Sequence, residues 1–356
     1  MALDIVQRRL HNQLLSQTKF TQPSQVVAWL GAVQSQDYAG AKWAIAQRTN
    51  GLTDADIEQA FARGEILRTH VMRPTWHFVT PADIRWMLEL TAPRVRAAMA
   101  YTNRQLGLDT AIFKKSNAVL AKGLRENQHL TRSELGEILQ KAGVPVDGLR
   151  LGHLMGRAEL DGVICSGARR GKQHTYALLD ERAPQVKTLE RDEALAELTR
   201  RYFRSHGPAT LRDFVWWSGL TTNDARTGID FVKPQLEGET MDEQTYWFVS
   251  SATKKKSSST VHLLPDYDEY TVGYTDRTSI FNVTHTDKLD SRGSILFQYA
   301  ILMDGLVIGT WKRVLKKNEV VIHIVPFTAL TSDQNQAIID ATQQYGKFLE
   351  LPVVLA

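Results

Sequence analysis

The spacing of hydrophobic residues predicts three helices near the N-terminus, followed by strands. Apolar residues recur at helical intervals over residues 3–16 and over residues 26–33. Thr53 and Asp56 resemble a capping box, so a third helix is predicted to begin there. Over residues 67–80 the period changes to two, which predicts a pair of strands.

The period of two places polar side chains on one face of the predicted strand pair and apolar side chains on the other. The polar face carries Arg73, Thr75 and His77. A histidine on such a face is either a hydrogen-bonded structural residue or an acid or base, and the pattern leaves both interpretations open.

The same order of elements recurs twice along the chain. After a helix over residues 84–100, Thr131 caps the next helix, residues 149–160 form a further helix and residues 163–178 form a hairpin. A third copy begins at Arg191 and ends in a strand over residues 245–249. Helices followed by a strand pair are typical of a winged helix, and three copies indicate a tandem array.

The rest of the chain is predicted to be β-rich. Strands are expected at residues 294–302, 306–314 and 319–325, with a closing helix at residues 333–349 and a solvated loop at residues 254–259. We therefore predict an α+β protein of three tandem winged-helix units and a C-terminal β-rich domain. The predicted divisions are 1–80 (first winged helix), 81–110 (helical linker), 111–186 (second winged helix), 187–256 (third winged helix) and 257–356 (β-rich domain).

Composition indicates a globular protein without a membrane span. Of its 356 residues 43% are hydrophobic, and the mean hydropathy is −0.28. No apolar run approaches the roughly 20 residues of a membrane span, and the N-terminus lacks the pattern of a signal peptide. The single cysteine, Cys165, excludes an internal disulfide framework. We therefore expect a cytoplasmic protein in which Cys165 is either a small buried hydrophobe or a nucleophile.

Positive charge gathers in the middle of the chain. Residues 90–215 carry 21 Lys and Arg against 14 Asp and Glu, a net charge of +7, whereas the remainder carries −3. The tip of the predicted hairpin holds Arg169, Arg170 and Lys172, with His174 just beyond it. Such a tip suits contacts with phosphate groups, although an ordinary solvated basic surface has the same composition.

Gln34 and Gln36 form the stretch around which we interpret the chain. Residues two positions apart face nearly opposite sides of a regular helix. We therefore place the pair where the second helix ends, near Gly40, because an unwinding backbone can bring both amides toward one ligand. The pair proves little by itself: the chain has 21 glutamines, and a second Gln-x-Gln occurs at residues 334–336.

Three acidic residues, Asp266, Asp268 and Glu269, follow the predicted third copy. Their spacing lacks the glycine of a calcium loop, and no pair of histidines accompanies them. We therefore interpret them as a hydrogen-bonded structural corner and expect no metal.

Taken together, these motifs resemble those of the bacterial tandem winged-helix DNA glycosylases, a group of winged helix DNA-binding domain-containing proteins. The group includes the azinomycin-resistance enzyme that unhooks interstrand crosslinks. The resemblance rests on the three helix-turn-helix units, the early Gln-x-Gln, and the stretches at residues 72–79 and 263–277. It spans nearly the whole chain.

The resemblance implies that Gln34 and Gln36 are catalytic; the residue between them, usually aliphatic in that family, is Ser35 here. It also implies a monomer without a cofactor that acts on double-stranded DNA containing alkylated purines. Two further groups are expected to assist. The residues expected to support catalysis are Asp37, Arg73, Thr75 and His77; those expected to bind DNA are Arg169, Arg170, Lys172 and His174.

The implied reaction needs no strong base. Alkylation at N7 makes guanine a cation and a good leaving group, so a positioned water and well-aimed dipoles suffice. A glutamine side chain offers both a carbonyl acceptor and an amide donor. Two other classes remain open: a regulator that uses residues 149–160 as a recognition helix, and a DNA-binding scaffold that has lost its activity.

Overall fold

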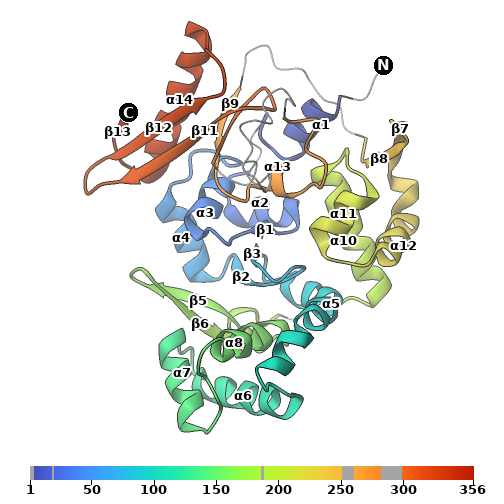
Figure 1. Cartoon of the computed structure of the whole chain (residues 1–356), viewed down its shortest axis with the longest axis vertical. Helices are drawn as coiled ribbons and strands as arrows, with labels where there is room; N and C mark the ends of the chain where they lie inside the picture. The colour runs from blue at the N-terminus through green and yellow to red at the C-terminus, as the bar shows by residue number, and fades with distance from the viewer. Residues whose placement is uncertain (1–3, 18–19, 186–187, 251–259, 282–298) are drawn as a thin grey trace.

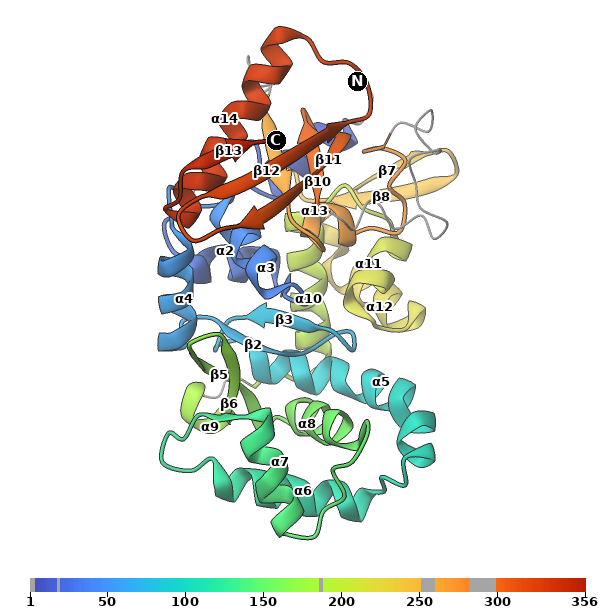
Figure 2. The ribbon, with the colours of Figure 1, turned by 60° about the vertical axis from the view of Figure 1, so that its left-hand side comes forward.

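The computed structural model of the chain describes residues 4–17, 20–185, 188–250, 260–281 and 299–356. The predicted α+β class is confirmed: helices alternate with small antiparallel sheets, and a larger sheet stands at the C-terminal end of the chain (Figure 1). The second copy of the helical unit lies at one end of the molecule and the C-terminal sheet at the other (Figure 2). No helix in the described part of the chain is long and apolar enough to cross a membrane.

The first region contains four helices and a three-stranded sheet in the order β1-β3-β2. Its elements are α1 (Ile5–Asn12), α2 (Pro23–Leu30), β1 (Val33–Gln34), α3 (Tyr38–Ala46), α4 (Asp54–Arg63), β2 (Leu67–His70) and β3 (Trp76–Val79). The predicted capping box is confirmed, because Thr53 and Asp56 exchange hydrogen bonds of 2.8 and 3.2 Å. The strand pair is also confirmed, but residues 71–75 form a turn. Arg73 and Thr75 therefore lie in that turn and not on a strand face beside His77.

The position predicted for the glutamine pair is wrong. Helix α2 ends at Leu30, where Gly31 adopts a φ of +87° that favours glycine. Gln34 then lies on strand β1, and α3, which the sequence pattern did not predict, begins only after Asp37. The chain thus leaves the helix at Gly31, well before Gly40.

The second region follows a long helix, α5 (Ile84–Gln105), and has a core of its own that includes Leu120, Leu135 and Leu154. Its elements are α6 (Thr110–Gly123), β4 (Leu130–Thr131), α7 (Arg132–Lys141), α8 (Arg150–Leu160), β5 (Ile164–Arg170), β6 (Gln173–Leu178) and α9 (Leu179–Arg182). The predicted Thr131 cap and the predicted hairpin, now β5 and β6, are both confirmed.

The β5–β6 hairpin and α9 join the second region to α4. Arg169 forms an ion pair of 3.1 Å with Glu58. Arg182 donates to the Phe61 carbonyl oxygen at 2.5 Å and to the Ala62 carbonyl oxygen at 2.7 Å. These contacts join the hairpin and α9 to the first region.

The third region packs its helices against α5, in a core that contains Trp86, Leu198 and Phe203. Its elements are α10 (Arg191–His206), α11 (Leu211–Ser218), α12 (Thr222–Val232), the 3-10 turn η1 (Lys233–Gln235), β7 (Glu237–Met241) and β8 (Gln244–Phe248). The side chain of Thr210 caps α11 and that of Thr221 caps α12. Strand β8 confirms the strand predicted near residues 245–249.

The C-terminal region is a five-stranded sheet in the order β13-β12-β11-β10-β9, covered by α14. Its elements are β9 (Val261–Leu264), α13 (Glu269–Val272), β10 (Ala300–Met303), β11 (Leu306–Leu315), β12 (Val320–Pro326), α14 (Ser332–Leu349) and β13 (Val353–Leu355). The predicted strands at 306–314 and 319–325 and the closing helix are confirmed. The predicted loop at 254–259 and the first part of the strand predicted at 294–302 lie outside the described residues.

Candidate functional site

Gln34 and Gln36 lie at and just beyond the end of a short strand. Gln34 pairs with His77 across β1 and β3, and the Ser35 N–H donates to the Trp76 carbonyl oxygen at 2.7 Å. Strand β1 ends at Gln34, and Gln36 lies in the bend that leads to α3. The second Gln-x-Gln, at residues 334–336, lies on helix α14 instead. The pairing of β1 with β3 therefore places both glutamines beside the turn before β3, without any unwinding of a helix.

Arg73 fixes the orientation of the Gln34 amide. Its Nη2 donates to Gln34 Oε1 at 2.7 Å. Since a guanidinium has no acceptor, the Gln34 oxygen must face Arg73 and the amide nitrogen must face elsewhere. That nitrogen donates to none of the described residues. Gln34 has 7% of its surface exposed, and its N–H groups are unused among the described residues.

The Gln36 side chain is exposed and loosely held. Its Oε1 lies 3.5 Å from the Trp76 backbone nitrogen, at the outer limit of a hydrogen bond. The carbonyl of Gln36 is therefore available as an acceptor, and both glutamines contact the same segment, residues 73–76. The two glutamine side chains therefore lie near each other's contacts, and they do not point to opposite sides of the protein.

Glu269 supports this segment, a role that sequence reasoning missed. Its Oε1 accepts the Gln34 backbone N–H at 2.8 Å, and its Oε2 accepts the Trp217 indole N–H at 2.9 Å. Burial alone would raise the pKa of Glu269, but the His206 hydrogen bond, the Arg73 charge and the Gln34 N–H together lower it to about 2. The buried Glu269 carboxylate thus binds the backbone of Gln34, although the two residues are 235 positions apart in the sequence.

The acidic stretch that contains Glu269 is hydrogen-bonded, as predicted. Asp268 is fully buried and pairs with Arg48 through two contacts of 2.7 and 2.8 Å. Asp266 is half-buried, and burial beside Asp37 raises its pKa to about 6. The described residues contain no group of three or more His, Cys, Asp or Glu side chains placed to hold a metal.

His77 is fully buried and neutral near pH 7. Burial, and then the Arg73 charge, lower its pKa to about 3. Its Nδ1 lies 2.9 Å from the Thr75 carbonyl oxygen, and its Nε2 lies 3.4 Å from Arg73 Nη2. This geometry makes His77 a brace for Arg73 and for the turn that contains Thr75.

The burial of His77 predicts acid sensitivity. Below its unfolded-state pKa of about 6.5 the unfolded chain binds a proton that the folded chain excludes until about pH 3, so stability falls as the pH falls. We expect this residue to remove roughly 2 kcal/mol of unfolding free energy between pH 7.5 and pH 5. Urea unfolding should show a smaller difference between the two pH values for His77→Gln. An unchanged difference would mean that His77 is not the group responsible.

Asp37 lies at the N-cap position of α3, where a carboxylate favours the positive end of the helix. Its Oδ2 accepts the Tyr299 hydroxyl at 2.7 Å. Asp37 therefore begins a helix, and it forms no ion pair among the described residues. Its position directly after Gln36 keeps a negative charge beside the pair.

The basic residues of the hairpin differ in whether they form ion pairs within the protein. Arg169 is paired with Glu58, and Arg170 is paired with Glu134. Lys172 is exposed and forms no ion pair within the described part of the chain. His174 packs its ring at 4.9 Å from that of Tyr38, and burial with nearby Arg68 lowers its pKa to about 4. The hairpin therefore offers one unpaired cation, Lys172, and two arginines that must exchange partners to meet a phosphate.

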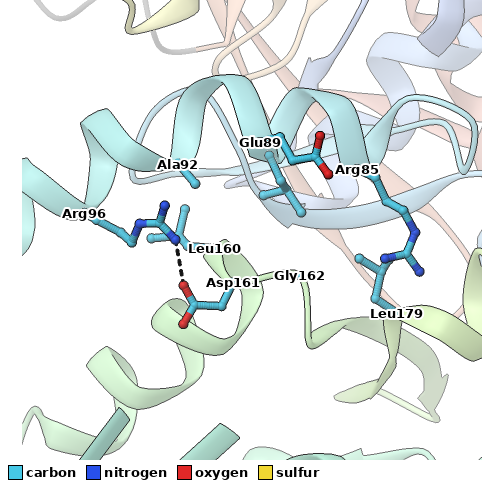
Figure 3. A pocket seen from close by; sticks show the side chains of 9 residues that line it. Arg85, Glu89, Ala92, Arg96, Leu160, Asp161, Gly162 and Leu179 are labelled. Atoms are coloured by element: carbon cyan, nitrogen blue, oxygen red, sulfur yellow. Dashed lines mark hydrogen bonds and ion pairs between the residues drawn. The ribbon is translucent and has the colours of Figure 1, made fainter. Parts of the chain in front are cut away.

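A separate cavity of about 390 Å³ lies between α5 and the turn after α8 (Figure 3). Arg85 and Glu89 line it, together with Arg96, which pairs with Asp161 at 2.8 Å. None of the candidate site residues line this cavity. Cys165 is buried elsewhere, and burial raises the pKa of its thiol to about 12, which makes it a poor nucleophile.

Comparisons with known proteins agree on one relationship. The family described as "DNA glycosylase AlkZ-like" matches residues 27–348. An "Interstrand DNA cross-link repair glycosylase" from Streptomyces sahachiroi is 25% identical over 328 residues, which cover 86% of each chain. The solved structure of the Streptomyces sahachiroi DNA glycosylase AlkZ aligns with a TM-score of 0.79 at 21% identity, covering 99% of this chain and 98% of that one.

Proposed function

Because the chain belongs to the AlkZ-like DNA glycosylase family, we propose that it hydrolyses the N-glycosidic bond of N7-alkylated purines in double-stranded DNA. The observation that carries this proposal is the glutamine pair, whose side chains both contact residues 73–76, with the Gln34 amide oriented by Arg73. We extend the substrates to purines in interstrand crosslinks, since the curated relative is named for crosslink repair.

The proposed fold assignment is a tandem array of three winged helices. In each of the first two regions a helix, a short strand, two helices and a strand pair follow one another, and the three strands form one antiparallel sheet; in the third region, helices precede the β7–β8 pair. We retain the divisions at residues 80, 110, 186 and 256 as the proposed boundaries, and we propose that the protein acts as a monomer. The separate core of the second region supports a division on each side of it.

The two glutamines have different proposed roles. As the bond between C1′ and N9 breaks, its electron pair moves to the purine and neutralises the alkylated ring, while positive charge develops on the sugar. Gln36, with a loosely held carbonyl, orients the water that adds to C1′. Gln34, with its oxygen occupied by Arg73, donates an N–H bond to the nucleotide.

The residues around the glutamine pair position its side chains and set the charge of its surroundings. Arg73, His77 and Glu269 hold Gln34, and the Glu269 carboxylate offsets the positive charge of Arg73. Asp37 contributes negative charge near the developing sugar cation. Because Gln36 is exposed, we propose that the lesion is reached on an open surface, which accommodates a base that cannot leave its crosslinked partner.

The hairpin is the proposed contact with the DNA backbone. Lys172 meets a phosphate directly, whereas Arg169 and Arg170 do so after releasing Glu58 and Glu134. His174 lies near the tip of the same hairpin, at the start of β6. This arrangement binds duplexes with little sequence preference, in contrast to a regulator that reads bases with a recognition helix.

A single-lesion oligonucleotide tests the proposed activity. We expect the protein to release N7-methylguanine from a duplex that contains one such base and to leave an abasic site that alkali converts into a strand break. The undamaged duplex serves as the control and should stay intact. Absence of breaks, combined with tight binding to one particular undamaged sequence, would instead identify a regulator.

A further inference from the structure

Two adjacent tryptophans on α11 have opposite environments. Trp217 is fully buried, whereas Trp216 has 44% of its surface exposed. One residue along a helix is a rotation of about 100°, so one indole enters the core and the next reaches the surface. Trp216 is the one tryptophan among the large exposed hydrophobic residues of the described chain.

The exposed indole is held in place. Its Nε1 donates to the Val272 carbonyl oxygen at 2.9 Å, and Trp217 donates to Glu269 at the other end of the same short helix, α13. The polar edge of Trp216 is therefore satisfied within the protein. What remains for a ligand is the aromatic surface.

The Arg73 side chain lies between Trp216 and Gln34. The guanidinium carbon of Arg73 lies 5.9 Å from the Trp216 ring centroid, and the same guanidinium binds Gln34. The end of α11 also abuts the Arg73 turn, because a Cβ on Gly219 would lie 2.2 Å from the Met72 carbonyl oxygen. The backbone at the end of α11 therefore packs directly against the turn that carries Arg73.

We propose that the exposed surface of Trp216 packs against the alkylated purine and selects it by its positive charge. The inference rests on the proposed function and adds a specificity residue to it. An indole ring attracts cations through the negative face of its π system and also stacks on bases of any sequence. Arg73 lies at the outer limit of cation–π range and is paired with Gln34 and offset by Glu269, so it leaves the ring open to a second cation.

The selection acts on a difference between substrates. A normal guanine is neutral, whereas an N7-alkylguanine carries a full positive charge before the glycosidic bond breaks. An aromatic contact therefore favours the damaged base on binding, before any chemistry takes place. Undamaged DNA gains only the weaker stacking contribution.

The test compares Trp216→Leu with Trp216→Phe and with a matched control. Phe231→Leu removes another aromatic side chain that is 44% exposed, on α12, outside the proposed site. Each variant is assayed for binding to duplexes with and without one N7-methylguanine, and for the single-turnover rate of excision. Thermal melting confirms that each variant is folded.

We expect Trp216→Leu to lower the preference for the damaged duplex and the excision rate by about tenfold, while affinity for undamaged DNA stays within about twofold. Trp216→Phe should retain most of both quantities, and Phe231→Leu should match the wild type. Equal preference in the wild type and Trp216→Leu would overturn the inference, as would equal losses in Trp216→Leu and Trp216→Phe, which would point to the Val272 hydrogen bond. Binding and excision are read separately, so a wild type that prefers damaged DNA without excising the base would contradict the proposed function alone.

Discussion

Replacing Gln36 by alanine is expected to lower the single-turnover rate of N7-methylguanine excision by about 10²–10³-fold, and Gln34→Ala should have an effect of similar size. The first change removes the loosely held carbonyl that orients the water. The second removes the donor whose direction Arg73 fixes and leaves the buried guanidinium without its acceptor. Quenched-flow or manual single-turnover assays with excess enzyme measure both rates directly.

Substitution by glutamate separates the two roles. Gln36→Glu keeps an acceptor, so it should retain at least about ten times the activity of Gln36→Ala. Gln34→Glu keeps the contact with Arg73 but offers no N–H, so it should be nearly as inactive as Gln34→Ala. If Gln36→Ala excised the base at the wild-type rate, Gln36 would have no part in positioning water.

Asp268→Asn is expected to reduce the free energy of unfolding by about 3–5 kcal/mol, the largest stability effect we predict for a single substitution. Asp268 and Arg48 are both fully buried and share two contacts of 2.7 and 2.8 Å. Asparagine keeps the size of the side chain but leaves the Arg48 charge unpaired in the interior. Urea unfolding at pH 7.5 measures the loss.

An exposed ion pair provides the matched control for this prediction. Arg63 and Glu65 are separated by 2.7 Å, but their side chains are 58% and 41% exposed. Water and salt screen such a pair, so Glu65→Gln should change the stability by no more than about 0.5 kcal/mol. Similar losses in the two variants would show that burial of the Arg48–Asp268 pair carries no special weight.

Local signals in the sequence predicted local structure well. Thr53 and Thr131 each accept a hydrogen bond from the residue three positions later, so each helix start could be predicted from a few adjacent positions. The β5–β6 hairpin was equally readable, because its turn and both strands are contiguous. These elements account for most of the predicted order of helices and strands.

The environment of the glutamine pair depends on partners that are distant in sequence. Strand β1 is only two residues long and exists because it pairs with β3, so a helical periodicity found over residues 26–33 extended the predicted helix too far. Glu269 lies 235 residues from Gln34. The acidic stretch around Glu269 indicated a hydrogen-bonded corner, but nothing in its own pattern identifies Gln34 as its partner.

The contacts of His174 and Arg182 with the first region have a consequence for how damage is found. They hold the hairpin and α9 beside the first region before any DNA arrives, and they do not depend on the Arg169–Glu58 ion pair. We expect these contacts to persist when DNA binds, so that adaptation falls largely to the duplex, whose deformability depends on its sequence and on damage. DNA segments that deform easily to fit the protein are bound longest, so the deformability of the DNA contributes to the search for lesions.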